Sequence, residues 1–79
     1  MNTSEFRVKG EELLKKVEDL IREGNVRRII IKNTKGETYI EIPLGVGIIG
    51  AILAPVLAAV GAIAALAADF TIEVIRKEE

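Results

Sequence analysis

A run of 27 residues without a charged side chain, residues 42–68, constrains this sequence more than any other feature. Placed on a helical wheel at about 100° per residue, residues 46–68 separate into two faces. One face carries the large aliphatic residues, and the other carries glycine, alanine and Pro55. Because a helix that is apolar all round must be covered all round, this run needs a partner on both faces.

The small-residue face predicts close packing against another helix. Glycine and alanine at three- and four-residue spacing let two helix backbones approach each other. We therefore expect self-association through this face, most simply as a C2 dimer. Pro55 is expected to kink the helix or to split it into two. The residues of the predicted self-association face are Gly47, Ala51, Ala54, Ala58, Gly61, Ala62 and Ala65.

The segments on either side of this run show regular patterns. Residues 11–23 repeat leucine, valine and isoleucine at helical spacing, and Gly24 follows as a C-cap. Residues 26–32 and 37–42 predict a β-hairpin across a turn at residues 33–36, and residues 70–76 predict a third strand. Residues 1–10 predict an N-terminal arm or a short strand, and residues 77–79 a charged C-terminal end.

These patterns predict a single α+β domain over residues 11–76, in the order helix–strand–strand–long apolar helix–strand. The hairpin and the returning strand would form a small three-stranded sheet packed on the long helix. The order of these strands stays open between 1-2-3 and 3-1-2. The predicted core face of the sheet consists of Ile29, Ile31, Ile40, Ile42, Phe70, Ile72 and Val74.

Composition argues against most catalytic chemistry. The chain has no histidine and no cysteine, which removes the common zinc ligands, thiol nucleophiles and disulfides. The carboxylates of residues 11–23 each have a lysine or arginine within four residues and predict surface ion pairs. We therefore expect no enzyme, no catalytic residue, no metal and no cofactor.

The balance of charge gives no reason to bind nucleic acid. Eleven basic and twelve acidic side chains leave a formal charge of −1. The basic residues of the hairpin are expected to pair across strands with Glu37, Glu41 and Glu73. Tyr39 is expected on the same charged face as Glu37 and Glu41.

Two alternative functions stay open. The uncharged run is long enough to cross a bilayer, so residues 44–68 could associate with or insert into a membrane. Insertion would leave residues 70–76 alone beyond the span, with both strand edges unpaired, which favours a soluble cytoplasmic oligomer. Residues 1–10 carry charges where a cleavable signal peptide would need an apolar segment.

The second alternative is a phosphate or nucleotide site. Gly45, Gly47 and Gly50 form a G-x-G-x-x-G motif before the apolar helix, and Asp69 lies 19 residues after Gly50. Backbone N–H groups at a helix N-terminus can hold a phosphate. However, the preceding strand belongs to an antiparallel hairpin and Pro43 intervenes, so close helix packing explains these glycines more simply.

Four segments carry a family resemblance. They are GNVRRIIIKN at residues 24–33, EIPL at 41–44, PVLAA beginning at Pro55, and TIEV at 71–74. With these segments the sequence resembles, over residues 8–75, the bacterial domain-of-unknown-function family 4342. The resemblance implies the order of the elements, and it implies no activity and no catalytic residues.

Overall fold

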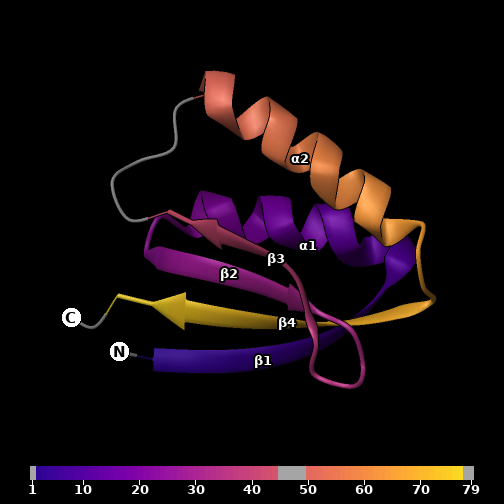
Figure 1. The fold of residues 1–79 in the computed structure, drawn as a ribbon. Helices are drawn as coiled ribbons and strands as arrows, with labels where there is room; N and C mark the ends of the chain where they lie inside the picture. The colour runs from indigo at the N-terminus through magenta and orange to yellow at the C-terminus, as the bar shows by residue number, and fades with distance from the viewer. Residues whose placement is uncertain (1, 45–49, 78–79) are drawn as a thin grey trace.

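Two helices lie on one face of a four-stranded antiparallel sheet in the computed structural model (Figure 1). The structure describes residues 2–44 and 50–77. In chain order the elements are β1 (Asn2–Lys9), α1 (Gly10–Glu23), β2 (Val26–Lys32), β3 (Thr38–Pro43), α2 (Gly50–Ala64) and β4 (Asp69–Arg76).

The predicted fold was wrong in two respects. The sheet has four strands rather than three, because residues 2–9 form a strand that pairs with β4 from Asn2↔Arg76 to Lys9↔Asp69. The predicted long apolar helix is a short one, since α2 has 15 residues and ends at Ala64. The chain needs the residues after Ala64 to turn back, so that Asp69 can begin β4 beside Lys9.

The strand order is β1-β4-β2-β3. The hairpin and the returning strand therefore follow the 3-1-2 alternative, with the returning strand β4 next to β2. Because every neighbouring pair is antiparallel, β1 runs parallel to β2 with β4 between them. In the same way, β3 runs parallel to β4 with β2 between them. The fold thus consists of two interleaved split β-α-β units.

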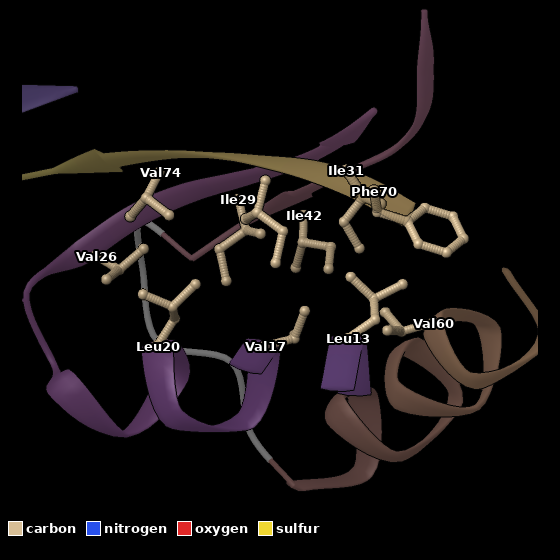
Figure 2. Packing of buried hydrophobic residues seen from close by; sticks show 11 residues of the cluster. Leu13, Val17, Leu20, Val26, Ile29, Ile31, Ile42, Val60, Phe70 and Val74 are labelled. Carbon is tan, nitrogen blue, oxygen red and sulfur yellow. The ribbon is translucent and has the colours of Figure 1, made fainter. Parts of the chain in front are cut away.

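The core lies between α1 and the sheet (Figure 2). Leu13, Val17 and Leu20 recur on one face of α1 and are completely buried. The predicted core face of the sheet is confirmed, since six of its seven residues are buried and Ile40 is partly buried against them. The prediction that this face packs on the apolar helix needs correction, because α1 provides most of its cover.

The second helix, α2, packs mainly on α1. Among the described residues it adds one completely buried side chain, Val60, to the core. Val56, Leu57 and Ile63 are partly buried against the core. Helix α2 continues through Pro55, so the proline does not split it.

Gly10 allows the start of α1 to lie against the end of α2. A Cβ atom on Gly10 would come within 2.6 Å of the Ala64 carbonyl oxygen and 2.9 Å of the Ala67 oxygen. The Gly10 N–H donates a hydrogen bond of 2.9 Å to the oxygen of Ala68. At the other end of α1, Gly24 adopts the left-handed conformation (φ 83°) of a C-cap, as predicted.

Candidate interaction surface

From residue 54 onward, the exposed residues of α2 are small and apolar. Val56, Leu57, Val60 and Ile63 pack in or against the core, whereas Ala54, Pro55, Ala58 and Ala62 are exposed. Beyond the helix end, Leu66 has 66% of its surface exposed. The helix sequence contains no polar or charged side chain, so this surface can make apolar contacts only.

The structure brings much of the predicted self-association face together. Ala54, Ala58, Ala62 and Ala65 are exposed. Gly61 is half-buried, and a Cβ atom added there would meet nothing within 4 Å. Gly47 and the side chain of Ala51 lie outside the described part of the chain. We call the four exposed alanines together with the half-buried Gly61 the alanine face; its residues are Ala54, Ala58, Gly61, Ala62 and Ala65.

The glycine motif is only partly described. Gly45 and Gly47 lie outside the described residues, and Gly50 is the first residue of α2. Asp69 follows the opposite end of this helix, whose 15 residues span about 22 Å at 1.5 Å per residue. A ribose-binding acid would have to lie near the glycines, and the fold therefore does not bring Asp69 to Gly50.

Two basic residues of the hairpin, Arg28 and Lys32, pair with acids across strands as predicted. Arg28 and Glu41 form an ion pair of 3.1 Å, and Lys32 donates a hydrogen bond of 2.5 Å to Glu73. This hydrogen bond raises the pKa of Lys32 above its ordinary value of 10.5. The negative charges of Glu73 and Glu5 act in the same direction, and desolvation opposes them. These cations already have partners, which is the arrangement of a structural charge network.

Two carboxylates of α1, those of Asp19 and Glu23, form ion pairs. Asp19 pairs with Lys15 at 3.6 Å within the helix. Glu23 accepts a hydrogen bond of 3.0 Å from Nε of Arg76, whose Nη1 also donates to the Ser4 hydroxyl at 3.2 Å. Arg76 thus ties the end of α1 to the edge of the sheet. In the described ranges no cluster of three acidic residues suits a metal ion.

The sequence did not predict a groove between β1 and α1. Phe6, Arg7 and Val8 line one side, four residues of α1 line the other, and the cavity volume is about 300 Å³. The Lys16 ammonium lies 4.2 Å from the centre of the Phe6 ring. Alternation of Phe6 and Val8 with charged residues was the available signal for this strand. The α1 residues in the groove are Glu12, Lys15, Lys16 and Asp19.

The fold and its surfaces define a small α+β domain with an exposed apolar helix face. The model of the family described as "Domain of unknown function (DUF4342)" matches residues 1–76, and the chain belongs to this family. No curated protein and no solved structure matches the chain. Within the described residues, neither helix combines the length and apolarity that crossing a membrane requires.

Proposed function

We propose that this domain is a non-enzymatic self-association module in which a second copy covers the alanine face of α2. The observation that carries the proposal is an exposed helix face without any polar group. Ala54, Ala58 and Ala62 lie on it at four-residue spacing. Exposed apolar surface of this kind is characteristic of protein contacts, and small residues let two helices approach to about 8 Å.

A second copy accounts for this face better than a bilayer does. Strands β3 and β4 flank α2 in the chain and lie in one sheet, separated only by β2. If residues 44–68 crossed a membrane, β4 would leave the middle of the sheet and lose its pairing with both β1 and β2. Membrane insertion would therefore break the central strand pairing of this fold.

The size of α2 sets the expected strength of the contact. A helix of 15 residues is about 22 Å long and about 10 Å wide, which gives a projected footprint on the order of 220 Å². A standard stable interface buries about 800 Å² per partner. We therefore expect association that depends on protein concentration rather than a permanent dimer.

Light scattering during size-exclusion chromatography tests the proposal. The protein is purified without detergent and measured over a concentration series. We expect its mass to rise from 8.6 kDa toward a discrete multiple. Ala62→Glu should lower the mass reached at each concentration below that of the wild type, because the new carboxylate would be desolvated against a second copy. Arg22→Gln, on the exposed surface of α1, lowers the net charge equally and should leave the mass of the wild type unchanged.

A steric variant provides an independent test. Ala58→Leu with Gly61→Leu fills the alanine face; Ala58 is exposed, and a Cβ atom at Gly61 would meet nothing within 4 Å in the monomer. A wild type that stays monomeric at every concentration contradicts the proposal. The proposal is also contradicted if Ala62→Glu and the double variant both reach the same mass as the wild type. Recovery of the wild type only from the membrane pellet would support the membrane alternative.

A further inference from the structure

Strand β1 offers an unprotected edge of the sheet. It pairs with β4 through eight consecutive residues without a bulge, and its other edge has no partner strand among the described residues. Strand β3, at the opposite edge, has six residues, ends in Pro43 and pairs with β2 across a register shift. Proline and bulges discourage pairing with another chain, so β1 is the edge suited to accept a further strand.

The groove between β1 and α1 leaves room beside this edge. Phe6 and Val8 form its apolar floor, and residues of α1 form its wall. The two lysines that α1 contributes to the groove already have local partners, because Lys16 lies over the Phe6 ring and Lys15 pairs with Asp19. We call the side of the sheet that the helices cover its inner face and the other side its outer face. A strand added to β1 would extend the sheet and place its inner-face side chains in this groove.

We propose that the added strand is β1 of a second copy, running antiparallel and centred on Phe6. Such a pair has C2 symmetry about an axis through the sheet. On the outer face, Glu5 of each copy then lies opposite Arg7 of the other. On the inner face, the two Phe6 side chains meet at the axis. The result is a continuous eight-stranded sheet with both pairs of helices on one side.

The charges of β1 select this register. Thr3, Glu5, Arg7 and Lys9 share the outer face, and a symmetric pair must keep equal faces together. If the pair is centred on Glu5 or on Arg7, that residue faces its own copy at the axis, and two identical charges meet. If the pair is centred on Val8, Arg7 of each copy faces Lys9 of the other, which gives two like-charge pairs. Centring on Ser4 pairs Glu5 with Thr3 only. Centring on Phe6 gives two opposite-charge pairs and no like-charge pair.

The environment of Glu5 also favours a cation on its free side. Within the sheet Glu5 lies opposite Glu73, a like-charge pair. The Lys32 ammonium lies 2.5 Å from the carboxylate of Glu73, so its positive charge mainly neutralises Glu73 and not Glu5. Arg7 of the second copy would supply a positive charge on the other side of Glu5.

A charge-swap experiment tests this pairing separately from the alanine face. It is done in the Ala62→Glu background with any N-terminal tag removed, and mass is measured by light scattering and native mass spectrometry. The background protein should form a dimer. Glu5→Arg or Arg7→Glu should each weaken the dimer at least tenfold in Kd, because each places like charges opposite each other. Both residues are exposed on the outer face, so neither change disturbs the core.

Two combinations should restore the dimer. The double variant Glu5→Arg, Arg7→Glu reverses both pairs, and an equimolar mixture of the two single variants should form a heterodimer. Thr3→Glu, a change on the same face outside these pairs, serves as the control and should retain the dimer. A monomeric Ala62→Glu background overturns the β1 pairing and leaves the alanine-face proposal standing if the wild type assembles. Single variants that dimerise like their background, or combinations that fail to restore it, also overturn the pairing.

Discussion

Replacing Gly10 with alanine tests how closely α1 and α2 approach each other. In an exposed helix this substitution stabilises by up to about 1 kcal/mol, because alanine restricts the unfolded chain and favours the helix. At Gly10 the new Cβ atom would lie 2.6 Å from the oxygen of Ala64 and 2.9 Å from that of Ala67. Both neighbours are backbone atoms, so neither can rotate away as a side chain would.

The structure gives the size of the required shift. Ordinary contact begins at 3.4 Å, so the Ala64 oxygen must move by about 0.8 Å relative to Gly10. This movement strains the hydrogen bond from the Gly10 N–H to Ala68, which is worth on the order of 1 kcal/mol. Overpacking of this kind costs about 1–3 kcal/mol. After the gain in helix propensity, we expect a net destabilisation of about 1–2 kcal/mol.

Thermal and urea unfolding measure this effect. For a domain of this size the expected loss lowers Tm by roughly 5–15 °C. Gly61→Ala is the matched control, because its Cβ has open space in the interior of α2 and should stabilise by up to about 1 kcal/mol. Both variants are compared at one low protein concentration, so that association does not contribute. If Gly10→Ala stabilises the protein as Gly61→Ala does, the close approach of the helices is wrong.

Three further changes have expected outcomes. Gly24→Ala should lower stability by about 1–2 kcal/mol in calorimetry, because its φ of 83° strains any residue with a Cβ atom; unchanged stability would exclude the left-handed cap. Val60→Ala should lower the free energy of unfolding in urea by about 2–3 kcal/mol, because Val60 is completely buried. Leu66 is 66% exposed, so Leu66→Ala should lower it by less than about 0.5 kcal/mol. Equal losses would contradict the burial of Val60. The raised pKa of Lys32 stabilises the fold below its ordinary value of 10.5, and this contribution is lost as the pH rises through the higher folded value. Glu73→Gln should therefore flatten the alkaline part of the stability profile measured by chemical unfolding, and an unchanged profile would argue against the Lys32–Glu73 interaction.

Elements with strong local patterns could be predicted closely from the sequence. The helix expected at residues 11–23 is Gly10–Glu23, and the strand expected at 26–32 has the same bounds in the structure. The strand expected at 70–76 begins one residue earlier, at Asp69. In each case side-chain periodicity and a local stop signal, such as Gly24, determine the element.

Features that depend on distant residues could not be predicted in this way. For residues 1–10 the sequence predicted an arm or a short strand, but not that this strand joins the sheet, because its partner β4 lies at the other end of the sequence. The length of α2 depends on the return of the chain to Asp69, which periodicity within an uncharged run does not reveal. Tyr39 was expected among the charged residues, but the register shift beside Lys32 brings its ring to 5.6 Å from that of Phe70.

Of the two candidate surfaces, one could be predicted from local sequence spacing and the other could not. The large and small faces of α2 were visible in the sequence, because helical spacing alone separates them. The groove beside β1 was not, since its two sides come from separate elements that meet only in the fold. Its position depends on β1 pairing with β4, which places the strand under one side of α1.

The position of β4 has a consequence for how this chain folds during synthesis. β4 is the last of the described strands, yet it lies between β1 and β2, and its outermost pair joins residues 2 and 76. Until β4 has left the ribosome, β1 has no strand to pair with and the sheet cannot close. Meanwhile the uncharged segment from residue 42 to 68 has already emerged in part, without the core that later covers one side of it. Such late, sequence-distant closure slows folding, and exposed apolar surface on an incompletely folded chain favours aggregation.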